Sequence, residues 1–296
     1  MHISLHAALA LLAAAPAGAP APGAPAAAGT PAAEASAAGG ALRARLDAGL
    51  PGVPAGAARA LWASSLLRGA PYRASPLGEG AGADPDPRFR LDAFDCVTLV
   101  ETAMALGAAG SVADAGALLD RIRYDGAPAW ATRRHYAESQ WLPGLVRDGW
   151  LEPLGAGAVG VPTVRVERRL DDDAWREAER AGRALPGLGP GARPEGTFAL
   201  EVVPLSALLE AAPRMPEGTL LVVVREPRPA RPSLVTHMGL LVRAPGGGLA
   251  LRHASDVPGV LRVRDEPLDA AVRRMARRSW KVVGVAAYRL RTVTDR

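Results

Sequence analysis

The fold is decided by the stretch Phe94-Asp95-Cys96-Val97-Thr98-Leu99-Val100-Glu101. Its cysteine, Cys96, is the only one among 296 residues, so it cannot form a disulfide within the chain. The stretch is typical of a turn that enters an apolar helix, with Asp95 placed to cap the first turn. Unpaired N–H groups and the positive end of the helix dipole meet at such a start, and both lower the pKa of a thiol. On this stretch alone, Cys96 is either a nucleophile or a small buried apolar residue.

Helical spacing dominates the first part of the chain. It predicts one or two helices over residues 42–67, a helix from Cys96 to about Gly107, and a helix over residues 115–123. The pattern then changes to that of strands. These are expected over residues 197–203, 219–224, 235–243, 248–253, 260–264 and 282–290, with a helix over 268–277. Helices followed by an antiparallel meander predict an α+β domain.

Two histidines are placed to work with the cysteine. His237 opens one predicted strand and His253 ends the next, and Pro245-Gly246-Gly247 between them indicates a hairpin. A register that sets residue 253 opposite residue 239 puts both imidazoles on one side, whereas a slip by one residue separates them. Either histidine alone is typical of a satisfied strand-edge residue. A thiolate, a base and a group that orients the base are the parts of cysteine catalysis, and these three residues supply them.

These motifs resemble those of the NlpC-type cysteine peptidases and amidases, which are bacterial cell-wall hydrolases with a papain-like fold. The matching segments are His237-Met238-Gly239, His253-Ala254 and Gly69-Ala70-Pro71-Tyr72. The stretch at 94–101 is similar to one branch, formerly a domain of unknown function, that has N-acetylmuramoyl-L-alanine amidase activity. That branch also carries motifs that residues 123–126, 133–136 and Trp141 match. The resemblance covers roughly residues 60–292.

The resemblance implies a role for each matching residue. Cys96 would be the nucleophile, His237 the base and His253 the orienting residue, and the Cys96 N–H would form part of the oxyanion hole. Tyr72 would donate a hydrogen bond near the attacked carbonyl, or else pack on the core as a turn aromatic. Five further residues are candidates for substrate binding, with local scaffold as the alternative: Arg133, Arg134, His135, Tyr136 and Trp141. Their arginines could pair with substrate carboxylates.

Three classes of function remain open. The favoured one is hydrolysis of the MurNAc–L-Ala amide in peptidoglycan fragments (muropeptides), and its alternative is an endopeptidase that cuts the stem peptide after γ-D-Glu. A zinc hydrolase with Cys96, His237 and His253 as ligands is disfavoured because paired ligand spacings are missing from the sequence. The third class is a non-catalytic wall-binding module. We expect no cofactor and no metal, and the sequence does not predict the oligomeric state.

The amino-terminal end predicts export. Residues 1–28 resemble a signal peptide whose apolar part, residues 7–15, is too short to span a membrane. A flexible leader rich in Ala, Pro and Gly is expected over 29–41. Residues 42–296 would form a single catalytic domain with an inserted segment at about 154–195. The expected location is therefore periplasmic or secreted, and no later segment is long and apolar enough to cross a membrane.

The charge of the chain carries little functional information. The net charge is +5, and Lys281 is the only lysine, so the basic charge is almost entirely arginine. This bias, with abundant alanine and glycine, is typical of GC-rich coding. No basic run is interleaved with aromatic residues, so nucleic acid is not an expected partner.

Overall fold

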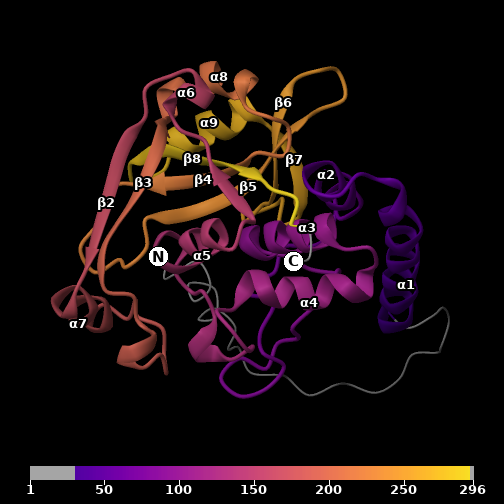
Figure 1. The fold of residues 1–296 in the computed structure, drawn as a ribbon, viewed down its shortest axis with the longest axis horizontal. Helices are drawn as coiled ribbons and strands as arrows, with labels where there is room; N and C mark the ends of the chain where they lie inside the picture. Colours follow the sequence, from indigo (N-terminus) through magenta and orange to yellow (C-terminus); the bar gives the residue numbers. More distant parts are fainter. Residues whose placement is uncertain (1–30, 294–296) are drawn as a thin grey trace.

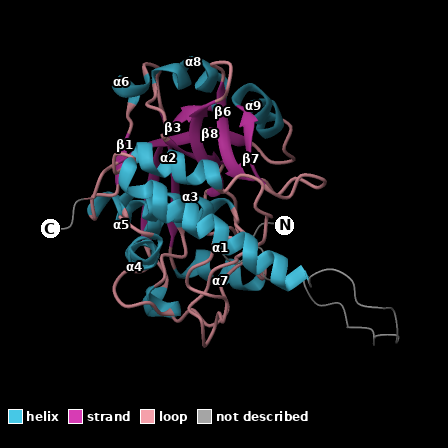
Figure 2. Ribbon diagram, turned by 90° about the vertical axis from the view of Figure 1, so that its right-hand side faces the viewer, coloured by secondary structure: helices cyan, strands magenta, loops and turns pink. Residues whose placement is uncertain are grey.

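The computed structural model describes residues 31–293, and the predicted signal peptide lies outside them. One antiparallel sheet separates two helical layers (Figure 1). Figure 2 shows α8 and α9 on one side of the strands and α3 and α4 on the other. Each layer closes a hydrophobic core against the sheet. The predicted combination of helices with an antiparallel sheet in an α+β fold is confirmed.

The first layer holds four helices, which are α1 (Pro31–Gly49), α2 (Ala57–Leu66), α3 (Cys96–Ala108) and α4 (Val112–Arg123). Helix α3 is its centre. All residues of α3 from Cys96 to Gly107 are buried, because the helix packs between α2, α4 and strand β5. A helix that is apolar on every side is expected in such a fully enclosed position.

The leader predicted over residues 29–41 differs from the structure. The chain is helical from Pro31 onward, so α1 covers most of that stretch. Alanine is the strongest helix former, and proline is tolerated in the first turn of a helix. These two preferences outweigh the compositional argument for a flexible segment.

The strands of the sheet follow the order β2-β3-β8-β4-β5-β6-β7, and β1 also pairs with β8. Their bounds are β1 Leu151–Pro153, β2 Val164–Leu170, β3 Gly196–Pro204, β4 Leu220–Arg225, β5 Val235–Arg243, β6 Leu249–Ala254, β7 Val263–Pro267 and β8 Val282–Leu290. The run β4 to β7 is the expected meander. Strand β8 enters between β3 and β4, however, and β7 begins three residues later than predicted.

The remaining helices are short. They are α5 (Leu142–Arg147), α6 (Ala156–Val159), α7 (Asp172–Arg180), α8 (Leu208–Ala211) and α9 (Leu268–Ala276). The segment predicted as an insertion contains α6, β2 and α7. Strands β2 and β3 form a long ribbon that carries α7 away from the main layers (Figure 1). Within the described residues, no helix is long and apolar enough to span a membrane.

Candidate active site

The start of α3 is held by a capping box. The Asp95 carboxylate accepts hydrogen bonds from the N–H groups of Val97 and Thr98 at 3.1 and 2.8 Å, and the Asp95 N–H donates to Thr98 Oγ1 at 3.0 Å. Ser75 N–H donates to the second carboxylate oxygen of Asp95 at 3.1 Å, which ties the preceding loop to the helix. The helix start and its cap were both predicted, and both are confirmed.

The thiol of Cys96 differs electrostatically from the prediction. The side chain is only 8% exposed, and burial, followed by the Asp95 charge, raises its pKa well above the ordinary value. The backbone N–H of Met238 donates to the sulfur and lowers the pKa, but by less. The capping carboxylate thus opposes the helix dipole that was expected to favour the thiolate. In this state Cys96 is a neutral thiol that needs a base.

The two histidines form a hydrogen-bonded pair. His237 lies on β5 and His253 on β6, and His237 Nε2 is 2.7 Å from His253 Nδ1. Strand β5 pairs with β6 in the expected register, since residue 240 lies opposite residue 252. Gly239 permits this close approach, because a Cβ there would lie 2.5 Å from the Arg252 carbonyl oxygen and 3.0 Å from His253 Cβ. The predicted contact between the imidazoles is therefore confirmed. The predicted contact between His237 and the sulfur stays a prediction.

Two residues that sequence reasoning missed extend the pair. Glu266 Oε2 on β7 lies 3.3 Å from His253 Nε2, although this contact is not aligned well enough to be a hydrogen bond. Arg274 Nη2 on α9 donates to Glu266 Oε2 at 2.7 Å. Burial raises the pKa of Glu266, but its contacts with His253 and Arg274 outweigh burial and lower it. The only sequence signal was an acidic residue beside an expected strand.

The order of contacts assigns the protons on the imidazoles. A carboxylate only accepts hydrogen bonds, so Glu266 favours the tautomer of His253 that carries its proton on Nε2. His253 Nδ1 then accepts the proton of His237 Nε2, which leaves Nδ1 of His237 unprotonated. Burial is the first cause that lowers the pKa of both imidazoles, so both are neutral near pH 7. His237 Nδ1 is thus available to take a proton.

Tyr72 is held at the turn that leads to α3, and the charge of Cys96 acts on its phenol. Its N–H donates to the Leu261 carbonyl at 2.9 Å, and it bridges to Phe94 at the turn that precedes α3. Burial, followed by the charges of Cys96 and Asp95, raises its pKa far above the ordinary value. The phenol therefore stays protonated and can donate a hydrogen bond. The role that the resemblance implies for Tyr72, a hydrogen bond near the attacked carbonyl, stays a prediction.

The five candidates for substrate binding lie elsewhere. Their exposed fractions are 5% or less. Arg133 Nη2 pairs with Asp84 at 2.9 Å and also with Glu79, whereas Arg134 pairs with Asp148. The His135 ring contacts the Trp130 carbonyl, Tyr136 packs on Trp175, and Trp141 lies in the main core. These contacts favour the alternative that the five residues are local scaffold.

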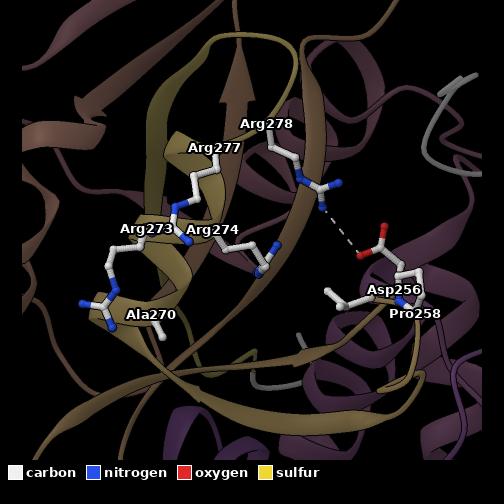
Figure 3. Close-up of a pocket in the computed structure, with 8 residues that line it drawn as sticks. Asp256, Pro258, Ala270, Arg273, Arg274, Arg277 and Arg278 are labelled. Carbon is white, nitrogen blue, oxygen red and sulfur yellow. Dashed lines mark ion pairs between the residues drawn. The ribbon is translucent and has the colours of Figure 1, made fainter.

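A cavity of about 550 Å³ opens between the loop after β6 and helix α9 (Figure 3). Arg278 faces Asp256 across it at 3.8 Å. Arg274, which holds Glu266, belongs to the same wall. The charge of Asp256 also raises the pKa of Cys96 and of Tyr72. Its other lining residues are Val257, Pro258, Ala270, Arg273 and Arg277.

The zinc alternative lacks a ligand cluster in the part of the chain that the structure describes. No group of three or more His, Cys, Asp or Glu side chains there is arranged to hold a metal ion. His253 Nδ1 is already directed at His237. The described geometry therefore matches a proton relay better than a metal site.

Comparison with known proteins relates this geometry to solved folds. A Legionella pneumophila protein assigned to the DUF1460 family model superposes with a TM-score of 0.71 at 20% identity, over 88% of this chain and 97% of that one. An N-acetylmuramoyl-L-alanine amidase from Bacteroides uniformis gives 0.60 at 20% identity, over 79% and 98%. A Bacteroides fragilis protein described as a xylanase gives 0.57 at 23%, over 77% and 98%. At such identities these similarities show the fold alone.

A family model supplies the assignment. No curated protein matches the chain. The model of the AmiA-like family, described as N-acetylmuramoyl-L-alanine amidase-like, matches residues 62–277. That match takes in α3 with Cys96, both strands of the histidine hairpin and the glutamate–arginine pair behind them. The chain therefore belongs to the AmiA-like family of N-acetylmuramoyl-L-alanine amidase-like proteins.

Proposed function

We propose that this chain is a cysteine-dependent amidase that hydrolyses the bond between N-acetylmuramic acid and L-alanine in peptidoglycan fragments. One observation carries the proposal. His237 is hydrogen-bonded to His253 at 2.7 Å with Glu266 behind it, and the next residue, Met238, donates its N–H to the Cys96 sulfur. The family assignment supplies the chemical class, and the proposal adds the nucleophile, the base and the bond. The proposal also includes a structural relationship between this chain and the cysteine peptidases with a papain-like fold.

Each residue has a defined step in the reaction. His237 Nδ1 takes the proton of the Cys96 thiol as the sulfur attacks the carbonyl carbon of the lactyl amide. The negative charge on the carbonyl oxygen is stabilised by the backbone N–H of Cys96 and the hydroxyl of Tyr72. The imidazolium returns its proton to the leaving nitrogen, which frees the peptide with an L-alanine amino terminus. Water, deprotonated by the same imidazole, then cleaves the thioester.

The neutral thiol explains why the relay is needed. A raised thiol pKa means that few molecules hold a preformed thiolate at neutral pH. The proton must therefore move to His237 during attack, and the imidazolium that forms needs a nearby negative charge. Glu266 supplies that charge through His253. A carboxylate stabilises the imidazolium of a catalytic triad in this way, and here Glu266 is a fourth member behind Cys96, His237 and His253.

The test is mass spectrometry of purified muropeptides incubated with the chain. The proposal predicts free stem peptide that begins with L-alanine, together with a glycan that has no peptide. Products that keep L-Ala-D-Glu on the glycan would instead establish the endopeptidase alternative. Activity that resists chelators and is lost on alkylation separates a thiol mechanism from a zinc hydrolase.

Export to the periplasm or the medium is also proposed, because residues 1–28 resemble a signal peptide. Peptidoglycan lies outside the cytoplasmic membrane, so export would bring the chain to the material from which its proposed substrates derive. Cell fractionation of the full chain, followed by amino-terminal sequencing of the exported form, tests it. Cleavage near residue 28 is the expected result.

A further inference from the structure

Five arginines of the inserted segment and of the β4–β5 region form one group. Arg168 comes from β2, Arg183 follows α7, and Arg225, Arg228 and Arg231 belong to the end of β4 and the loop that leads to β5. They act on one another electrostatically. Burial, followed by the charges of Arg231, Arg228 and Arg168, lowers the pKa of Arg225 to about 10. Burial, followed by Arg183 and then Arg228, lowers the pKa of Arg231. We call these five residues the arginine cluster.

Several nitrogens of the arginine cluster are buried without a partner. Nε and Nη2 of Arg168, Nη1 of Arg183 and Nη1 of Arg231 are closed to solvent and make no hydrogen bond. Leaving buried cationic donors unpaired is strongly unfavourable, and such groups call for a ligand or an ion. Unpaired donors from two parts of the inserted segment and from the β4–β5 loop therefore offer hydrogen bonds to an anionic group.

Other buried arginines of the chain hold carboxylates. Arg123 pairs with Glu101 at 2.7 Å, and Arg252 pairs with Asp265 at 2.7 Å. The cavity beside α9 follows the same rule, since three of its four arginines face Asp256, Glu266 or Asp269. Arg123 and Arg133 each leave one nitrogen unpaired as well, but both hold a carboxylate. Among the described residues, Arg168, Arg183 and Arg231 form no ion pair with a carboxylate.

The neighbouring carboxylates do not neutralise the cluster. Glu226 pairs with Arg228 at 3.2 Å. Glu138 favours the charge of Arg225, but its oxygens already accept hydrogen bonds from Ser233 Oγ and the Leu234 N–H at 2.9 and 2.7 Å. Two carboxylates thus face five guanidinium groups. The remaining positive charge suits a ligand that carries more than one negative charge.

The position of the cluster relates it to the proposed reaction. The loop with Arg228 and Arg231 leads directly into β5, and Arg231 precedes His237 by six residues. Six residues span at most about 22 Å, and an extended peptide of three to five residues spans about 10–18 Å. A substrate held at His237 could therefore reach the cluster with its peptide stem. Figure 1 shows the β2–β3 ribbon, which contributes Arg168, along the edge of the sheet.

We propose that the arginine cluster binds the free carboxylates of the peptide stem, an inference that rests on the proposed function. In the muropeptide the lactyl carboxyl group of the glycan forms the amide bond with L-alanine and carries no charge. The peptide stem keeps the α-carboxylate of D-glutamate and the carboxylates of later residues. Guanidinium groups bind carboxylates through two parallel hydrogen bonds. In this assignment the inserted segment takes part in substrate binding, because it contributes Arg168 and Arg183 beside the loop that precedes β5. The assignment also sets the polarity of the substrate, with its peptide toward the β2–β3 ribbon.

The test measures binding rather than turnover. The Cys96→Ala chain is titrated by calorimetry with the tripeptide L-Ala-γ-D-Glu-meso-diaminopimelate, and with the same peptide whose D-glutamate α-carboxylate is amidated. Arg183→Gln and Arg231→Gln, each combined with Cys96→Ala, are compared with Arg176→Gln. Arg176 lies on α7 near Arg183 but is 61% exposed and pairs with Asp173 at the surface. Arg231→Lys keeps the positive charge but lacks the two parallel N–H donors of the guanidinium group. It is used in place of Arg231→Gln if the glutamine variant fails to fold.

We expect amidation, Arg183→Gln and Arg231→Gln each to weaken binding by about tenfold or more, with Arg176→Gln unchanged. Removing Arg231 also relieves repulsion, so its melting temperature in the absence of peptide should stay constant or rise. A merely structural arginine would show the opposite, with a lower melting temperature and unchanged affinity.

Equal affinities of the parent and of both arginine variants would overturn the inference. Binding of inorganic phosphate without binding of the tripeptide would overturn it as well. The proposed function is tested separately, with muropeptides and the intact thiol. If the wild-type chain fails to hydrolyse them while peptide binding still depends on Arg183 and Arg231, the proposed function fails and the binding site stands.

Discussion

Glu266→Gln removes the negative charge behind the histidine pair with little change of volume. The glutamate oxygen lies 3.3 Å from His253 Nε2, and the imidazole centroids are 4.8 Å apart. The carboxylate is thus roughly 8 Å from the positive charge that forms on His237 during attack. At an effective dielectric constant of about 20, that separation corresponds to about 2 kcal/mol. Because Arg274 offsets part of the charge, we expect kcat/KM to fall by about 10- to 30-fold.

The same substitution shifts the pH dependence in a defined direction. Glu266 raises the pKa of both His253 and His237, so removing its charge lowers the pKa of the base. Activity requires the unprotonated base, and it is lost as the pH falls through that pKa. The acid limb of the kcat profile should therefore move to lower pH in Glu266→Gln.

The assay is amide hydrolysis of a purified muropeptide across a pH series. Asp269→Asn is the matched control, because Asp269 is also an acidic residue paired with an arginine on α9, but it is 52% exposed and has no contact with the histidines. The control should keep the wild-type rate and profile. Wild-type kcat/KM together with an unmoved acid limb in a folded Glu266→Gln protein would refute the proposed relay.

Four further outcomes are expected. Cys96→Ala and Cys96→Ser should be inactive and folded, as judged by turnover and circular dichroism. Activity at the wild-type level in either variant would exclude Cys96 as the nucleophile. His237→Ala should be essentially inactive, whereas His253→Asn should keep measurable activity, because an amide carbonyl still accepts the His237 N–H; equal loss in both would contradict an orienting role. Since the thiol pKa is raised, alkylation by iodoacetamide should quicken only at a pH above the range in which a free cysteine ionises, and a plateau near pH 7 would disprove this. Arg123→Met should lower the free energy of unfolding by about 3–5 kcal/mol in urea titrations, because it leaves Glu101 buried and unpaired; a loss below 1 kcal/mol would contradict it.

The parts of the site that are local in the sequence could be predicted. The cap at Asp95, the helix start at Cys96 and the hairpin register of the histidines each follow from a short run of residues. Capping and strand alternation are decided by near neighbours, and tertiary packing did not override them here.

The parts that depend on distant residues could not be predicted. The thiol pKa rises because burial and the cap outweigh the helix dipole, and burial is a property of the whole fold. Glu266 reaches His253 only because β7 pairs with β6. The sequence suggests Arg133 and Arg134 as ligands for substrate carboxylates, but their partners are Asp84, Glu79 and Asp148 of the chain itself. Motif residues thus indicated the family correctly while their individual tasks depended on packing.

The most direct test of the central claim is the mass of the covalent intermediate. A muropeptide is mixed with the chain, the reaction is quenched in acid within its first turnover, and the protein is digested and sequenced by mass spectrometry. We predict that Cys96 carries the muramyl acyl group of the glycan as a thioester, without any amino acid, and that Cys96→Ala carries nothing. An adduct that includes L-alanine and D-glutamate, or an adduct on another residue, would contradict the account.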